Sequence, residues 1–240
     1  MRDQRQQPPT RRARLRAETT REIKAIALDH AAAGGPDAIS LRAIARDMGM
    51  TAGAIYSYFP TRDDLVTTLI NEVYEALTEA VSAALAPVPP EDAARRILVW
   101  GEAFRAWALA NPAGFKLIYG DAVSGYRAPE GGAAPEPEHR ACTIVTGLVA
   151  AAWPEAAPTQ SGRTYEWSDF GAALVAAVRR EYPELPPAGV ALALRMWGRT
   201  HGLVSLEVYG HLGAMVHDPA PVYRAELLDM IRSIGLTPPE

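Results

Sequence analysis

The sequence predicts an all-α protein with a small N-terminal domain and a larger helical body. Apolar residues recur three and four positions apart along most of the 240 residues, which is the period of a helix. Ten such segments are separated by stretches that contain Gly and Pro, the residues that end helices. We expect a disordered basic tail over residues 1–14, a first domain over 15–62 and a helical body over 63–240. A single continuous helical body is the alternative.

Charge is distributed unevenly along the chain. The hydrophobic content of 48% and the charged content of 22% are ordinary for a soluble globular protein, and the net charge is −4. Residues 1–62 nevertheless carry eleven basic against six acidic residues, or +5, so the remaining 178 residues carry −9. A basic head on an acidic body indicates that only the head approaches a polyanion such as nucleic acid.

The N-terminus is polar and then strongly basic. Residues 1–10 are rich in Gln and Pro and are expected to be disordered. The basic cluster comprises Arg11, Arg12, Arg14 and Arg16. It is either a solvated tail or an arm whose Arg12 and Arg14 contact phosphates or enter a minor groove. A first helix is expected over residues 17–33, because a Gly pair starts at Gly34.

Two short helices joined by a turn follow. Residues 41–48 have one apolar face, and Gly49 supplies the backbone freedom that a sharp turn needs. Thr51 is placed to cap a second helix in which Ile55 and Phe59 face inward. The exposed side of that helix is small and polar. This pattern is a helix-turn-helix, which presents its second helix to the major groove of DNA.

The segment GMTAGAIYSYFPTRDDL closely resembles the recognition segment of the tetracycline-repressor (TetR) family of bacterial transcriptional regulators. The resemblance implies a dimeric regulator, usually a repressor, that binds a palindromic double-stranded operator and responds to a small molecule. The DNA-binding candidates in this region are Ser40, Arg42, Thr51, Ala52, Gly53, Ala54, Tyr56, Ser57 and Tyr58. Because the recognition helix has few long side chains, we expect sparse direct base readout and specificity that depends on DNA shape.

A long fourth helix is expected between its cap at Thr61 and Pro87. About 25 residues of helix span roughly 38 Å, enough to join the head to the body mechanically. Asp63 and Asp64 complement the positive helix end. By resemblance to the basic residue often found at this point in the family, Arg62 is expected to contact a DNA phosphate. The alternative is an ordinary surface charge.

Four further helices are expected over residues 91–109, 111–119, 138–153 and 167–181. The segment 120–137 between the second and third of them is rich in Gly, Pro and Ala and is expected to be a mobile loop. Aromatic residues are abundant in this region. They predict an apolar effector cavity whose lining candidates are Trp100, Phe104, Trp107, Phe115, Tyr119, Trp167, Phe170, Trp197 and His201. Each is also a plausible core residue.

The ninth helix, expected over residues 187–212, is apolar on more than one side. Such a helix must bury two of its sides, and we expect one side to pack on its own body and the other on a partner subunit. Its small residues would allow close approach, and a tenth helix over 222–234 can complete the contact. The dimer-interface candidates are Gly198, Gly202, Ser205, Leu206 and Tyr209. Trp197, His201 and Gly202 also resemble the tryptophan-histidine-glycine signature of one TetR C-terminal subgroup.

Other functional classes have little support in the sequence. We find no catalytic constellation, phosphate-binding loop, cofactor motif or set of metal ligands, so the protein is expected not to be an enzyme. A helical enzyme with a DNA-binding-like N-terminus and a regulator that takes no ligand are the alternatives. Cys142 is the only cysteine, and we recognise neither a signal peptide nor a membrane span. These features predict a cytoplasmic protein that does not bind membranes.

Overall fold

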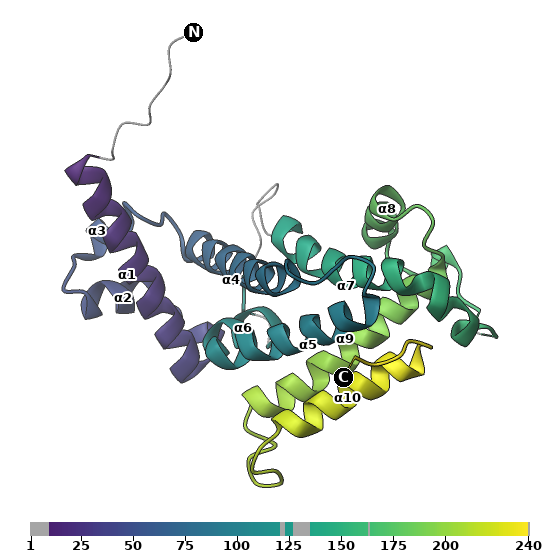
Figure 1. Ribbon diagram of the computed structural model, residues 1–240. Helices are drawn as coiled ribbons and strands as arrows, with labels where there is room; N and C mark the ends of the chain where they lie inside the picture. Colours follow the sequence, from purple (N-terminus) through teal and green to yellow (C-terminus); the bar gives the residue numbers. More distant parts are fainter. Residues whose placement is uncertain (1–9, 121–122, 127–134, 163, 240) are drawn as a thin grey trace. The chain divides into compact units, whose positions relative to one another are not determined.

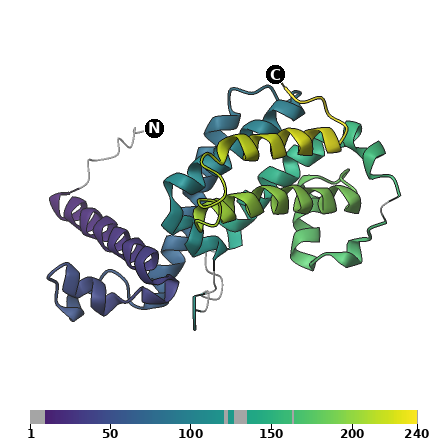
Figure 2. The same cartoon turned by 90° about the horizontal axis from the view of Figure 1, so that it is seen from below.

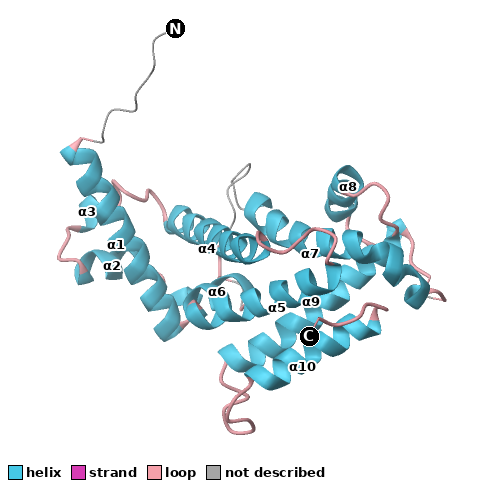
Figure 3. Cartoon of the chain, viewed as in Figure 1, coloured by secondary structure: helices cyan, strands magenta, loops and turns pink. Residues whose placement is uncertain are grey.

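The computed structural model describes residues 10–120, 123–126, 135–162 and 164–239 of the chain. Across these residues the regular structure is entirely helical, without a strand (Figure 3). The predicted all-α fold class is therefore confirmed. The disorder predicted for residues 1–9 lies outside the described residues, as does most of the predicted loop over 120–137. None of the helices in the described part of the chain combines the length and hydropathy needed to cross a bilayer.

The chain divides into two compact units. The N-terminal unit contains residues 1–73 and 113–134, and the C-terminal unit contains residues 74–112 and 135–240. The division falls inside one long helix, α4, after residue 73 instead of after residue 62, so this helix belongs to both units. Residues 113–134 were not expected in the N-terminal unit, because they are separated from it in sequence by about forty residues of the other unit.

The N-terminal unit consists of five helices, one 3-10 turn and a short ordered segment (Figure 1). Its elements are α1 (Arg11–Gly34), η1 (Pro36–Ala38), α2 (Leu41–Asp47), α3 (Ala52–Ile55), the first half of α4 (Arg62–Leu85), α6 (Pro112–Tyr119) and residues 123–126. Its fully buried side chains include Ile23, Ile39, Ile44, Ile55, Leu65, Leu69 and Phe115. Helix α1 packs on η1 and α2, and α2 packs on α3.

Helix α1 begins earlier than predicted. Thr10 caps it by accepting a hydrogen bond from the backbone N–H of Ala13 at 3.2 Å, so the helix starts at Arg11 instead of residue 17. Residues 11–14 therefore belong to a helix and not to the disordered tail that was predicted. The sequence analysis missed this because the first turns bury nothing, so they lack the apolar period used to find helices.

The C-terminal unit is a helical body built around α5, α7, α9 and α10. Its elements are the second half of α4, α5 (Ala93–Ala110), α7 (Pro135–Ala156), η2 (Ala157–Gln160), η3 (Trp167–Asp169), α8 (Ala172–Glu181), α9 (Pro187–Val208) and α10 (Ala220–Ser233). Helices α9 and α10 lie side by side in both views of the chain (Figures 1 and 2). Helix α7 packs on α9, and α10 also packs on α5.

Gly101 allows α5 and α10 to pack closely. A Cβ atom placed on Gly101 of α5 would lie 2.5 Å from Leu227 of α10, so only glycine permits this approach. Beside it, the Tyr223 hydroxyl donates a hydrogen bond to the Gly101 carbonyl at 2.9 Å. Burial raises the pKa of Tyr223 far above its usual range. Arg105 of α5 holds Glu207 of α9 with two hydrogen bonds of 2.6 and 2.7 Å.

Several helix boundaries in this unit differ from prediction, most of them by one to three residues. The single helix expected over 167–181 is split, because Phe170 and Gly171 adopt extended backbone between η3 and α8. Helix α7 continues past Pro154, which lies near the helix end and removes one backbone hydrogen bond. Helix α9 ends at Val208, four residues before its predicted end, and Gly210 follows with a positive φ of 79°.

Candidate nucleic-acid interface and effector domain

The turn between α2 and α3 has the geometry expected of a helix-turn-helix. Gly49 has a φ of 65°, which non-glycine residues rarely adopt, and the Met50 N–H donates to the Ala45 carbonyl at 2.8 Å. Thr51 caps α3 by accepting from the Ala54 N–H at 3.2 Å. Ser40 caps α2 in the same way, because its hydroxyl accepts a hydrogen bond from the Ala43 N–H at 3.5 Å. Local caps and one glycine thus position the second helix.

The recognition segment has one buried and one exposed side, as predicted. Ile55 is 0% exposed and Phe59 is 6% exposed, and they anchor the segment to the core of the unit. Ala54 and Tyr58 are half-buried. The exposed residues are Thr51, Ala52, Gly53, Tyr56 and Ser57. Tyr56, at 41% exposed, is the largest side chain on this surface. The surface can therefore lie in a groove without steric obstruction by long side chains.

The basic residues near this segment are carried by helices. Arg12 and Arg14 are exposed on the first turns of α1, and Arg42 is exposed on α2. Because the backbone of a helix is ordered, these cations are displayed at defined positions, and not along the flexible arm that was predicted. They retain the exposure that contact with phosphates requires.

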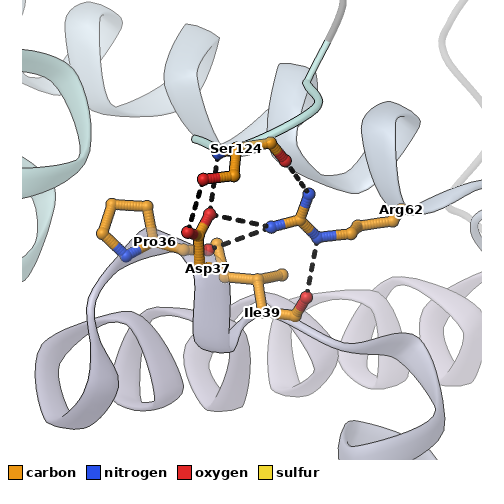
Figure 4. A network of polar contacts seen from close by, with 5 residues as sticks. All are labelled: Pro36, Asp37, Ile39, Arg62 and Ser124. Atoms are coloured by element: carbon orange, nitrogen blue, oxygen red, sulfur yellow. Dashed lines mark hydrogen bonds and ion pairs between the residues drawn. The ribbon is translucent and has the colours of Figure 1, made fainter. Parts of the chain in front are cut away.

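Arg62 is held by hydrogen bonds within the N-terminal unit. Its Nε donates to the Ile39 carbonyl at 2.9 Å, and its two terminal nitrogens donate to the carbonyls of Ser124 and Pro36 at 3.3 Å each (Figure 4). The Asp37 carboxylate lies 3.7 Å away, and the Arg62 side chain is only 28% exposed. The guanidinium is therefore engaged by carbonyls inside the unit, and its contact with a DNA phosphate stays a prediction.

Asp37 completes the network in Figure 4. Its two carboxylate oxygens accept hydrogen bonds from the N–H and the hydroxyl of Ser124, both at 2.7 Å. These two bonds, with a smaller contribution from Arg62, hold the pKa of Asp37 below its usual value. The Tyr126 hydroxyl adds a hydrogen bond of 2.8 Å to Thr67 of α4. The segment after α6 is thereby fastened to both η1 and α4.

One group of the predicted effector residues is brought together by α5 and α9. The ring centroids of Trp100 and Phe104 are 6.4 Å apart, and the Phe104 and His201 centroids are also 6.4 Å apart. Burial lowers the pKa of His201, which favours a neutral imidazole. Trp107 is 6% exposed, and its buried indole N–H has no hydrogen-bond acceptor within the described structure.

The other predicted effector residues fall into separate groups. Phe115 and Tyr119 contact each other at 5.1 Å but belong to the N-terminal unit. Near η3, Trp167 lies under the Arg179 guanidinium at 4.7 Å and Phe170 contacts Tyr165 at 6.4 Å. Sequence proximity and aromatic character alone grouped these residues. In the structure the rings of these residues contact different partners.

Trp197 lies on the exposed side of α9, at 38% exposed, with its ring centroid 4.8 Å from that of His201, and its role in effector binding stays a prediction. It belongs to a stripe with the period of a helix. The residues of this stripe are Leu194, Trp197, Gly198, His201, Gly202, Ser205, Leu206 and Tyr209. Leu194, Leu206 and Tyr209 are 47%, 40% and 41% exposed, and the space beside Gly198 and Gly202 is open. We call this stripe the α9 face.

Sequence reasoning missed several residues that the structure makes prominent. Asp37 and Ser124 are 87 residues apart, and no local pattern signals their pairing. Arg16 was recognised only as part of the basic cluster, although it contacts Ser57, 41 residues away.

Comparisons with known proteins agree with this geometry. The family described as bacterial regulatory proteins of the tetR family matches residues 25–69. The family described as the tetracyclin repressor-like C-terminal domain matches residues 97–230, more than half of the chain. This chain belongs to the TetR family. It is therefore a DNA-binding transcriptional regulator and not an enzyme. The subgroup assigned from Trp197, His201 and Gly202 stays a prediction.

Individual proteins that are similar to this chain support its assignment to the TetR family. The helix-turn-helix-type transcriptional regulators Rv1816 of Mycobacterium tuberculosis and Mb1846 of Mycobacterium bovis are each 33% identical over 207 residues. The match covers 83% of this chain and 83% of each relative. The crystal structure of the regulatory protein SCO4313 has a TM-score of 0.72 at 33% identity and covers 93% of this chain and 100% of that one.

A more distant structure shares the fold alone. A bacterial regulatory protein of the tetR family from Rhodococcus RHA1 has a TM-score of 0.60 at 19% identity, and the match covers 92% of this chain and 98% of that protein.

Within the described residues of the present regulator, no group of three or more His, Cys, Asp or Glu side chains is placed to hold a metal ion.

Proposed function

We propose that this regulator is a homodimeric repressor that binds a palindromic operator in the cytoplasm and is released by a small, largely apolar or aromatic molecule. The observation that carries the proposal is the recognition segment, whose small exposed side is anchored by buried Ile55 and Phe59. Thr51, Tyr56 and Ser57 offer polar contacts, and Ala52 and Ala54 suit thymine methyl groups. Gly53 and Tyr58 complete the surface, with Arg12, Arg14 and Arg42 positioned for phosphates.

The α9 face supports the homodimer. Its apolar side chains Leu194, Trp197, Leu206 and Tyr209 are exposed along one side of a body helix, and contiguous exposed apolar surface is typical of a protein–protein contact. The open space at Gly198 and Gly202 would let the same helix of a second copy approach closely. A two-fold arrangement places the same patch on both subunits, and two heads can then occupy half-sites about one turn of DNA apart.

The aromatic group of α5 supports an effector in the C-terminal unit. A buried indole N–H without an acceptor is costly, by about 1–3 kcal/mol, unless a ligand or water supplies the acceptor. We therefore expect an effector with an aromatic or aliphatic body, which packs on residues such as Phe104, and one acceptor atom, which accepts from Trp107. A neutral His201 would supply a second oriented polar group.

Release requires that the effector distinguish two states of the regulator. A hundredfold loss of operator affinity corresponds to about 2.7 kcal/mol of coupling free energy. Reciprocity then requires that operator DNA weaken effector binding by the same factor. An effector that binds both states equally would change nothing, however tightly it binds.

The DNA-binding test starts with genomic fragments captured by the purified full-length protein. A duplex of about 30 base pairs that carries the captured sequence is then titrated by fluorescence anisotropy, together with the same duplex in which one half-site is scrambled. We expect loss of most of the affinity on scrambling, and a strong decrease of affinity with salt. Equal affinity for both duplexes would contradict the palindromic operator.

The effector test uses intrinsic tryptophan fluorescence to screen small aromatic and aliphatic acceptor compounds, with and without the operator duplex. Trp107→Phe keeps the ring packing and removes the N–H donor, so it should weaken the binding of an identified effector while operator affinity stays unchanged. Trp153→Phe, at a half-buried tryptophan that is not an effector candidate, is the matched control. Compounds that bind the unmodified protein but leave operator affinity unchanged would identify a regulator that takes no allosteric effector.

A further inference from the structure

An open basic groove lies between the start of α1 and the end of the recognition segment. Its volume is about 640 Å³. The seven residues that line it are Arg11, Arg12, Leu15, Arg16, Thr19, Ser57 and Tyr58, none of them acidic. We call it the arm groove. Arg14 is not part of its lining, so only one of the two arm residues predicted to contact DNA faces it.

Arg16 bridges the two walls of the arm groove. Its terminal nitrogen donates a hydrogen bond of 2.7 Å to the backbone carbonyl of Ser57, and its guanidinium lies 4.7 Å from the centre of the Tyr58 ring. Carbonyls at the end of a helical segment lack partners within it, so a cation there is favourable. The planar guanidinium can satisfy the carbonyl and stack on the ring together, which a lysine cannot do.

This bridge has a consequence for the residues that precede it. Arg12 and Arg16 are one helical turn apart on α1, and Arg11 adjoins them on the same groove wall. Fastening Arg16 to Ser57 therefore holds the first turn of the helix beside the recognition segment. Without it, that turn would have no buried contacts to keep it in place, since residues 11–18 are all exposed.

We propose that Arg16 is the positioning residue of the phosphate contact already proposed for Arg12: it holds the arm groove against the recognition segment, so that Arg11 and Arg12 together meet one backbone phosphate of DNA. The proposal rests on the DNA-binding function described above. Two cations on an ordered helix lose less conformational entropy on binding than cations on a flexible tail would lose. The contact is independent of base sequence and extends the footprint of the head beyond the recognition segment.

The test measures the affinity of the full-length protein for a mixed-sequence duplex of about 30 base pairs between about 50 and 200 mM salt. The double variant Arg11→Ala, Arg12→Ala should flatten the salt slope by about 0.9 for each protomer bound, the value for one lost phosphate contact. Arg16→Ala should flatten the slope as well, although its own guanidinium is engaged with Ser57. Arg21→Ala, an exposed arginine on α1 outside the groove, should leave the slope unchanged.

Arg16→Lys separates positioning from direct contact. A direct phosphate contact would be retained by lysine, whereas a positioning role should leave the slope as flat as in Arg16→Ala. Hydrogen exchange of the amides in residues 11–19 should also quicken in both Arg16 variants but not in Arg21→Ala. Unchanged slopes in the groove variants, or full rescue by lysine, would overturn the proposal. Absence of any DNA binding by the unmodified protein would instead overturn the function itself.

Discussion

Replacing Arg62 by alanine should destabilise the N-terminal unit without changing the salt dependence of DNA binding. The substitution removes three hydrogen bonds from a cation to the carbonyls of Pro36, Ile39 and Ser124. Hydrogen bonds that involve a charged group contribute about 1.5–3 kcal/mol each. Two of the three are long, at 3.3 Å, and the side chain is 28% exposed, so water compensates for part of the loss. We expect a net loss of about 2–4 kcal/mol.

The assay has two readouts. Native-state hydrogen exchange of the α2 and α3 amides reports the free energy of opening in the N-terminal unit, and the anisotropy titration against salt reports the phosphate contacts. Arg62→Lys keeps the charge but can replace only part of the network, so it should recover less than half of the lost stability. Arg46→Ala, at an exposed arginine of α2, is the control for loss of one positive charge.

The refuting result is specific. If Arg62 contacts DNA, its replacement by alanine should flatten the salt slope by about 0.9 per protomer, whatever its effect on the exchange rates. That outcome was the expectation from the sequence. It would mean that the guanidinium leaves its three carbonyls when DNA binds.

Three further predictions concern the C-terminal unit. Gly202→Leu on the α9 face should convert the proposed dimer into a monomer in analytical ultracentrifugation and abolish tight operator binding, whereas Ala76→Leu on α4 should not; a dimeric Gly202→Leu protein would exclude this face. Gly101→Ala should lower the free energy of unfolding in urea by about 1–3 kcal/mol, because its Cβ would overlap buried Leu227; an unchanged midpoint would show that α5 and α10 are further apart. Burial lowers the pKa of His201 below its usual value of 6.5. The free energy of unfolding should therefore keep its full value above pH 6.5 and decrease as the pH falls from 6.5 towards the pKa of the folded state. His201→Gln should make the urea midpoint less dependent on pH in this range.

Local features of the N-terminal unit were predictable because their causes lie within a few residues. The cap at Thr51, the positive φ of Gly49 and the inward direction of Ile55 and Phe59 all depend on neighbours within one or two turns. Apolar period, caps and glycine are the signals that a chain carries for such structure. The same signals located most helices of the C-terminal unit and its small-residue stripe.

The tertiary structure decided which partners each polar or aromatic side chain has. Arg62 resembled a phosphate ligand in sequence, and only the approach of residues 123–126 showed that its guanidinium is occupied. Trp197 was grouped with buried aromatics but lies on the α9 face.

Arg16 joined a list of basic residues until Ser57, 41 positions away, supplied the acceptor that orients it. Helical period and capping depend on the chain itself, so they can be read from sequence. A hydrogen bond between distant segments depends on packing of the whole unit, which no short stretch of residues encodes.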